Sequence, residues 1–229
     1  MRAMILAAGR GERMRPLTDH VPKPLLQVAG KPLIVWHIER LVTAGITEIV
    51  VNLCWLGEQI EQTLGDGARY GARISYSPEP QALETAGGIA QALPHFEGQP
   101  FLVVNGDVWC DWNPADAAQR VASLATDTLA WLMLVDNPAQ HPEGDFQLQD
   151  SGLVSDAGTQ DGAVTLTFSG IGIYRPALFH EIAEHQPAPL APLLRKAMAA
   201  GKVIGSHYQG QWTDVGTPQR LMQLDTAMR

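Results

Sequence analysis

The sequence predicts a three-layer α/β fold in which helices cover both faces of a mostly parallel β-sheet. Strand-like apolar runs alternate with helical patterns along the chain, which is typical of this fold class. The 229 residues, 45% of them hydrophobic, suffice for one substantial core, and no shift in composition marks a second domain. We therefore expect a single domain over residues 1–229.

The expected elements follow one another in a regular order. The first strand, near residues 3–8, is an apolar run of the length of a buried parallel strand. Further strands are expected near residues 48–53, 73–77, 101–104, 129–135 and 168–174. Helices are expected near residues 32–44, 56–64, 85–93, 114–125, 189–200 and 217–228. Residues 146–167, rich in Gly, Asp, Gln and Thr, predict short antiparallel strands and a substrate-facing loop.

Charge and composition exclude several classes of protein. The formal net charge of −8 argues against nucleic acid as a partner, because binding a phosphate backbone requires clustered Lys and Arg. The two cysteines, Cys54 and Cys110, are too few for a disulfide framework and are interpreted as buried reduced thiols. No signal peptide precedes the first strand, and no apolar run approaches the ~18 residues of a membrane span. We expect a cytoplasmic monomer without a membrane partner.

A basic loop that contains two glycines follows the first strand. Gly9 and Gly11 let main-chain N–H groups approach anionic oxygens, and Arg10, Arg13 and Lys23 supply positive charge. The spacing fits neither a P-loop, which needs Gly-Lys before Ser or Thr, nor the dinucleotide fingerprint, which needs a third glycine. We interpret the loop as a phosphate cradle of another type. The alternative is a basic turn without a ligand.

Two aspartates lie where an expected element begins or ends. Asp107 follows the strand near residues 101–104, at the edge where open parallel sheets bind ligands, and its carboxylate suits Mg²⁺. A turn aspartate that accepts from its own backbone is the alternative. Asp214 precedes Thr217 and Pro218, a favourable N-cap and first helical residue, so the helix does not need it.

Two glycines stand in the first turn of an expected helix. Gly87 and Gly88 would each cost about 1 kcal/mol relative to alanine in an exposed helix interior, and less near its end. Close approach of a flat ligand is a sufficient reason. The alternative is a helix that Thr85 caps and that packs tightly on the sheet.

These motifs and their order resemble the signature of the sugar-1-phosphate nucleotidyltransferases, which join a nucleoside triphosphate to a sugar phosphate and release pyrophosphate. The resemblance spans nearly the whole chain and lies in residues 6–14, 22–25, 84–88, 105–107 and 212–218. It implies one Rossmann-like nucleotidyltransferase domain. Its nucleotide-binding part would be about 1–110, its sugar-binding part about 111–216 and its C-terminal helix 217–229.

The resemblance implies transfer of a uridylyl group from UTP to a sugar 1-phosphate, with N-acetylmuramic acid α-1-phosphate as the first candidate. A sugar phosphate is already mostly dianionic at neutral pH, so its oxygen can attack the α-phosphorus in line without a general base. Three alternatives remain: a mannose-1-phosphate guanylyltransferase, a glucose-1-phosphate thymidylyl- or uridylyltransferase, and a non-catalytic nucleotide-sugar sensor.

The resemblance also implies roles for individual residues. Catalysis is expected from Arg13, Lys23 and Asp107, and Mg²⁺ binding from Asp107 and Asp214. The expected nucleotide-binding residues are Ala8, Gly9, Arg10, Gly11, Glu12, Arg13, Lys23, Gln81 and Gly87. Gln81 suits uracil because one amide offers both a donor and an acceptor, whereas base reading by Glu79 would favour guanine. Sugar contacts are expected at Asn105, Gly144, Asp145, Ser169 and Gly170.

One departure from related enzymes concerns charge. Many of them carry a Glu-Lys-Pro motif whose lysine contacts the sugar phosphate, whereas residues 121–174 contain neither Lys nor Arg. We expect Lys23 and one or two Mg²⁺ ions to take over this role. The lactyl carboxylate of a muramyl substrate would then meet backbone amides near residues 144–145 or 169–170.

Overall fold

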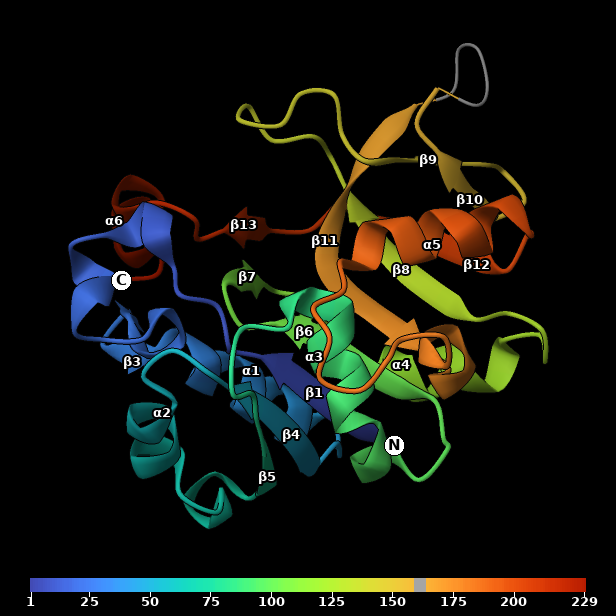
Figure 1. Cartoon of the computed structure of the whole chain (residues 1–229). Helices are drawn as coiled ribbons and strands as arrows, with labels where there is room; N and C mark the ends of the chain where they lie inside the picture. Colours follow the sequence, from blue (N-terminus) through green and yellow to red (C-terminus); the bar gives the residue numbers. More distant parts are fainter. Residues whose placement is uncertain (159–163) are drawn as a thin grey trace.

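The fold is built on one large sheet whose middle strands are parallel. The computed structural model describes residues 1–158 and 164–229. Strands β5, β4, β1 and β6 lie side by side in that order and run in one direction (Figure 1). Their bounds are Arg73–Pro78, Glu48–Leu53, Arg2–Leu6 and Phe101–Asn105. The predicted α/β class, with a mostly parallel central sheet, is confirmed.

A long antiparallel strand extends this sheet. β11 (Thr165–Tyr174) pairs with β6 on one side and with β8 (Ala130–Val135) on the other, both antiparallel. β12 (Val203–Tyr208) then pairs with β8 in parallel. The carboxyl ends of β8 and β12 therefore lie at the same edge of the sheet as those of β1, β4 and β6.

Two short strands lie within the stretch 146–167, where antiparallel strands are predicted. β9 (Phe146–Leu148) pairs antiparallel with β11, and β10 (Val154–Asp156) pairs antiparallel with β9. The strand prediction is confirmed for these residues. Residues 159–163 lie outside the described residues, and the substrate-facing loop remains a prediction.

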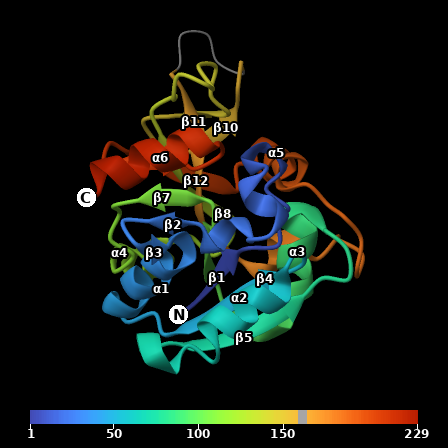
Figure 2. The same cartoon turned by 90° about the vertical axis from the view of Figure 1, so that its left-hand side faces the viewer.

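Helices lie on both faces of the sheet (Figure 2). Each begins and ends within two residues of its predicted position, because the apolar and capping patterns that mark helices are local. In chain order, the helices α1 to α6 span Leu33–Thr43, Gly57–Leu64, Glu84–Ala92, Asp116–Ser123, Leu190–Ala199 and Pro218–Ala227.

The two largest apolar clusters of the core lie one on each face of the sheet. Alternation along β1 shows the division, since Ala3 and Ile5 pack in the cluster with α1, whereas Met4 packs in the cluster with α3. The first cluster also contains residues of α2 and α4, and the second contains residues of α5. Both faces of the parallel strands are therefore buried, as this sheet type requires.

The sequence patterns missed β12 and two small strand pairs. β12 has only one fully buried residue, Val203, and its mixed sequence lacks the apolar run of a central strand. The pair β7 (Val108–Cys110) and β13 (Trp212–Asp214) joins distant parts of the chain. The hairpin of β2 and β3 spans Gln27–Val28 and Lys31–Pro32, too short to produce a periodic pattern.

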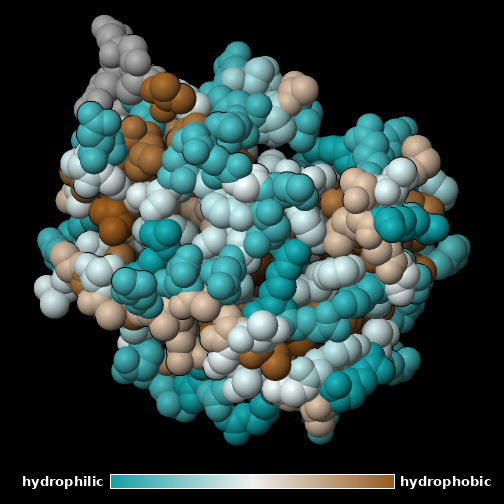
Figure 3. Space-filling view, turned by 180° about the vertical axis from the view of Figure 1, so that it is seen from behind, coloured by the Kyte–Doolittle hydropathy of each residue, from teal (hydrophilic) through white to brown (hydrophobic). Residues whose placement is uncertain are grey.

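The surface carries few large apolar groups. On the face seen from behind, hydrophobic residues form small separate groups among hydrophilic and intermediate ones (Figure 3). Within the described ranges, no helix has both the length and the apolar character needed to cross a membrane.

Candidate active site

A pocket of about 440 Å³ opens at the carboxyl ends of the parallel strands. Its wall contains the loop after β1, the residues around Lys23, the ends of β4 and β6, and the segment that leads into α3. Open parallel sheets bind ligands at this edge, because successive connections diverge there. Of the predicted site residues, the wall includes Ala8, Gly9, Gly11, Glu12, Arg13, Lys23, Asn105 and Asp107.

The loop after β1 is held by its own contacts. Gly11 has φ +66°, and a Cβ there would lie 3.0 Å from Thr18 Cγ2 and 3.2 Å from Lys23 Cβ, so only glycine fits. The Thr18 hydroxyl donates to the Gly11 carbonyl at 2.8 Å. Beside the loop, the guanidinium of Arg10 lies 4.6 Å from the ring centre of Trp55. These contacts within the protein fix the shape of the loop.

Lys23 and Asp107 form an ion pair inside the pocket. Lys23 Nζ lies 2.7 Å from Asp107 Oδ2, and the two side chains are 8% and 39% exposed. Lys23 begins a short 3₁₀ turn between Pro22 and Pro24, which restricts the backbone that carries the ammonium. The sequence predicts both residues separately, and the fold brings them into contact.

The antiparallel pair of β7 and β13 places Asp214 next to Asp107. Asp214 is opposite Val108 in the register, and Val215 N donates to the Asp107 carbonyl at 3.0 Å. Asp214 Oδ2 in turn accepts from Arg220 Nη1 at 2.7 Å. Carboxylate oxygens are the hard donors that Mg²⁺ takes from proteins, but Asp214, unlike Asp107, does not line the pocket. Among the described residues there is no group of three or more His, Cys, Asp or Glu side chains suited to a metal.

In the pocket wall, a buried amide connects three segments. Asn52, the polar residue near the end of the apolar strand β4, accepts from Ala7 N at 2.7 Å and donates to Glu79 Oε1 at 2.7 Å. Glu79 Oε2 accepts from Leu83 N at 3.0 Å. Asn52 was missed by sequence reasoning, although a lone amide near the carboxyl end of a buried strand is a usable signal.

The two glycines of α3 are explained by packing. A Cβ on Gly88 would lie 2.5 Å from Glu79 Oε1, and a Cβ on Gly87 would lie 2.6 Å from the Gln186 carbonyl oxygen. The Ala188 carbonyl accepts from the N–H groups of residues 86 and 87 at the start of the helix. Close approach of a ligand is thus not what requires these glycines. The structure does not bring Gln81 or Gly87 to the pocket wall.

The helix begins without a side-chain cap. Leu83, rather than Thr85, is the N-cap residue, so the capping role considered for Thr85 is wrong. Glu84 follows with φ +58°, a left-handed conformation that a residue other than glycine rarely adopts. Both Glu84 and Thr85 line the pocket. Such strain is often found at functional sites.

The predicted sugar contacts are only partly brought together. Asn105 lines the pocket, and Gly170 packs behind it, since a Cβ there would lie 2.7 Å from Asn105 Nδ2. Ser169 is fully buried and donates to the Met133 carbonyl at 2.8 Å. Asp145 accepts from Phe168 N at 2.8 Å.

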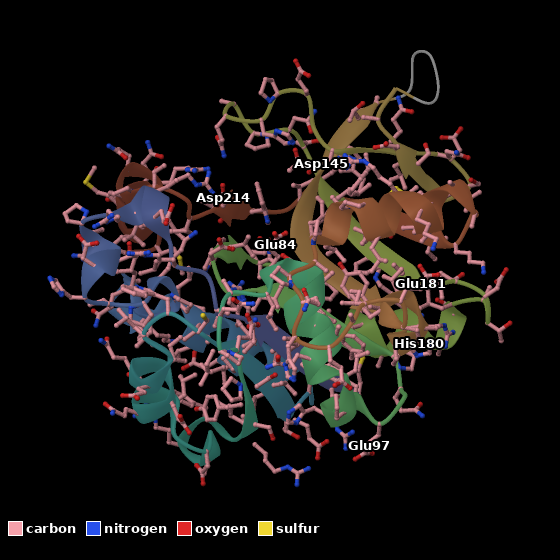
Figure 4. The ribbon with its side chains drawn as sticks, in the orientation of Figure 1. Glu84, Glu97, Asp145, His180, Glu181 and Asp214 are labelled. Atoms are coloured by element: carbon pink, nitrogen blue, oxygen red, sulfur yellow. The ribbon has the colours of Figure 1, made fainter. Side chains whose placement is uncertain are left out.

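Gly144, Asp145, Ser169 and Gly170 do not belong to the pocket wall. Figure 4 groups Asp145 with Glu84 and Asp214 in the upper middle of the molecule, whereas Glu97, His180 and Glu181 lie apart from them. The contact of Asp145 with a sugar remains a prediction.

Burial gives Glu79 a testable pH dependence. Its pKa is raised above the ordinary value of 4.5, mainly by desolvation, while its bonds to Asn52 and Leu83 act in the opposite direction. The folded protein then binds this proton more tightly than the unfolded chain, so the free energy of unfolding falls as pH rises above 4.5 through the raised pKa. In Glu79→Gln this fall should be smaller, as measured by urea unfolding across that range.

A control for this measurement is Glu181→Gln. The pKa of Glu181 is lowered by its hydrogen bond to Lys196. Titration of Glu181 therefore raises the free energy of unfolding as pH rises, opposite in sign to the effect of Glu79. Because Glu181 is exposed, solvent screening makes this effect weak. Identical pH profiles for the wild-type protein and Glu79→Gln would contradict the assignment.

The geometry defines the class of protein to which this chain belongs. A glycine-containing basic loop and a lysine–aspartate pair line one pocket at the edge of a parallel sheet, and Asp214 lies on the strand paired next to Asp107. The chain is a member of the nucleotidyl transferase family, whose model matches residues 2–229.

Individual relatives narrow this class. The chain is 58% identical to the N-acetylmuramate α-1-phosphate uridylyltransferase of Neisseria meningitidis serogroup B, over 97% of this chain and 96% of the relative. It is 38% identical to the enzyme of the same name from Caulobacter vibrioides, over 99% of this chain and 96% of the relative. A glucose-1-phosphate thymidylyltransferase structure from Bacillus anthracis matches with a TM-score of 0.87 at 20% identity, covering 100% of this chain and 95% of that one, which shows the shared fold.

Proposed function

We propose that the protein transfers a uridylyl group from UTP to N-acetylmuramate α-1-phosphate and releases pyrophosphate. The observation that carries this proposal is the 58% identity, over nearly the full length of both chains, to a relative with that name. The pocket supports it, because the cradle loop and the ion pair of Lys23 with Asp107 suit a reaction between two anionic phosphates.

In this mechanism an oxygen of the sugar phosphate attacks the α-phosphorus of UTP in line, and pyrophosphate leaves on the opposite side. Arg13 stabilises the charge on the leaving group, and the Lys23 ammonium holds phosphate near the reacting centre. Asp107 and Asp214 would hold Mg²⁺, which when bound offsets negative charge on both substrates. The phosphate nucleophile is already ionised, so no general base is needed.

The base is uracil in this proposal, and the loop from Ala8 to Arg13 binds the triphosphate. Both carboxylate oxygens of Glu79 accept hydrogen bonds from Asn52 and Leu83, which favours a structural role for Glu79 over reading of guanine. Gln81 is exposed and directly precedes Ala82, which lines the pocket, so its proposed role is to read the base from beside the pocket. Gly87 contributes to the site through the packing of α3.

The same proposal assigns a location and an organisation. Residues about 1–110 bind the nucleotide, about 111–216 bind the sugar, and 217–229 form the C-terminal helix. The protein acts as a cytoplasmic monomer on small-molecule substrates. A non-catalytic sensor of nucleotide sugars is the competing function, and the paired Lys23 and Asp107 argue against it because a sensor needs neither.

A pyrophosphate-release assay tests this function. UTP, dTTP, GTP, ATP and CTP are each paired with N-acetylmuramate α-1-phosphate, N-acetylglucosamine 1-phosphate, glucose 1-phosphate and mannose 1-phosphate, with Mg²⁺ present. The highest kcat/KM is expected for UTP with the muramyl substrate. Higher kcat/KM for GTP with mannose 1-phosphate would replace this function with guanylyl transfer, and no release from any pair would support the sensor.

A further inference from the structure

No Lys or Arg of the described residues within 111–216, the proposed sugar-binding part, lines the pocket. Arg175 follows β11, and Lys202 precedes β12, so both lie at the edge of the sheet opposite the pocket. The remaining cations there have other partners: Arg120 bonds Ser206, Arg195 pairs with Asp156 and Lys196 pairs with Glu181. An anionic sugar substrate must therefore find its counter-charge outside residues 111–216.

One arginine of the C-terminal helix lies against the pocket wall. Arg220, in the first turn of α6, pairs with Asp214, and its side chain is only 16% exposed. A Cβ on Gly216 would lie 2.5 Å from Arg220 Nη2, so the guanidinium packs directly on this glycine. Gly216 itself lines the pocket. Because residue 216 has no side chain, the largely buried Arg220 guanidinium lies directly behind the pocket wall.

The helix does not need this guanidinium for its own N-terminus. Thr217 is the N-cap residue, and its hydroxyl oxygen already accepts from the backbone N–H of Arg220 at 3.3 Å. The guanidinium contacts both the cap and Asp214: Nε donates to Thr217 Oγ1 at 3.4 Å, and Nη1 donates to Asp214 Oδ2 at 2.7 Å. Within the described residues Nη2 has no hydrogen-bond acceptor. One edge of the guanidinium therefore holds Asp214 while another donor remains available.

We propose that Arg220 binds the anionic group of the sugar substrate and thereby supplies the counter-charge that residues 111–216 lack. This inference rests on the proposed function. An arginine suits the role because its planar fork donates to two acceptors at once, one on Asp214 and one on a phosphate or carboxylate oxygen of the sugar. The packing of Arg220 on Gly216 keeps the fork next to the Asp214 carboxylate and directly behind a residue of the pocket wall.

The test compares Arg220→Gln, Arg220→Lys and the matched control Arg195→Gln, which loses a surface ion pair far from the pocket. Calorimetry measures the affinity for N-acetylmuramate α-1-phosphate in the presence of Mg²⁺ and a non-hydrolysable UTP analogue, and steady-state kinetics gives KM for each substrate. Arg220→Gln should weaken sugar-phosphate binding by about 10- to 100-fold, the effect of losing a charged hydrogen bond. The KM for UTP should change by less than about 2-fold. The sugar-phosphate affinity of Arg220→Lys should lie between those of the wild-type protein and Arg220→Gln.

A second sugar separates the two possible anionic groups. N-acetylglucosamine 1-phosphate has the phosphate but no lactyl carboxylate. An equal loss of affinity for both sugars assigns Arg220 to the phosphate, and a loss confined to the muramyl sugar assigns it to the carboxylate. Both results support the proposal.

Two results would overturn it. One is unchanged sugar affinity in a folded Arg220→Gln protein, and the other is equal weakening of UTP and sugar binding, which indicates a structural role through Asp214. If Arg220→Gln fails to fold, as judged by circular dichroism, Arg220→Lys replaces it in the test. Wild-type sugar affinity in Arg220→Lys would then contradict the proposal that the guanidinium binds the sugar anion. Absence of turnover in the wild-type protein would instead refute the proposed function.

Discussion

Replacement of Asp107 by alanine is expected to lower the turnover number by about 10²- to 10³-fold at saturating Mg²⁺, the usual range for removal of one preorganised electrostatic group. Asp107 holds the Lys23 ammonium at 2.7 Å, and its backbone carbonyl accepts from Val215 N. In the proposed mechanism its carboxylate also binds Mg²⁺ with Asp214. The substitution removes the ion pair with Lys23 and the proposed Mg²⁺ ligand, and it keeps the backbone hydrogen bond from Val215. Pyrophosphate release under single-turnover conditions measures the change in the chemical step.

Asp156→Ala is a matched control for this variant. The Asp156 side chain is 40% exposed and pairs with Arg195, whereas Asp107 is 39% exposed and pairs with Lys23. The control should keep wild-type turnover because Asp156 lies in β10, away from the pocket. Wild-type turnover in Asp107→Ala, with metal saturating, would remove Asp107 from the mechanism. Titration of Mn²⁺ followed by electron paramagnetic resonance gives a second readout, in which the variant should bind the ion more weakly.

Replacement of Lys23 by methionine is expected to lower kcat/KM by about 10²-fold or more, because the cation near the reacting phosphates is lost. The Lys23 side chain is 8% exposed, so methionine fills most of its volume and leaves the Asp107 carboxylate without its partner. An unpaired, half-buried carboxylate also repels anionic substrates. The KM values for UTP and for the sugar phosphate, measured separately, show which substrate loses its contact.

Lys31→Met provides the comparison for Lys23→Met. Lys31 pairs with Glu39, and its ammonium lies 4.0 Å from the ring centre of Trp36, so this substitution also removes an ion-paired lysine. It should leave the kinetic constants unchanged, since Lys31 does not line the pocket. Equal kinetic constants for Lys23→Met and the wild-type protein would refute the role of Lys23 as the counter-charge for phosphate.

Much of the fold follows from local sequence patterns. The apolar run before Gly9, the run before Asp107 and the helical patterns locate the six α-helices and the parallel strands β1, β4, β5 and β6, because burial periodicity repeats within each element. The edge strand β12 and the pair of β7 and β13 could not be found in this way. Their residues are half-buried or few, and their pairing joins segments more than 70 residues apart.

Local patterns in the sequence identified the order of the motifs and, among the residues that border the pocket, the loop, Lys23 and Asp107. Which of these side chains meet depends on the folded chain. Lys23 pairs with Asp107 across 84 residues, and Asn52 bonds Glu79 across 27. Folding also determines that Gly87 and Gly88 serve packing and that Arg220 lies behind Gly216. The physical reason is that a motif encodes the conformation of its own segment, whereas contacts between segments depend on how the strands align at the edge of the sheet.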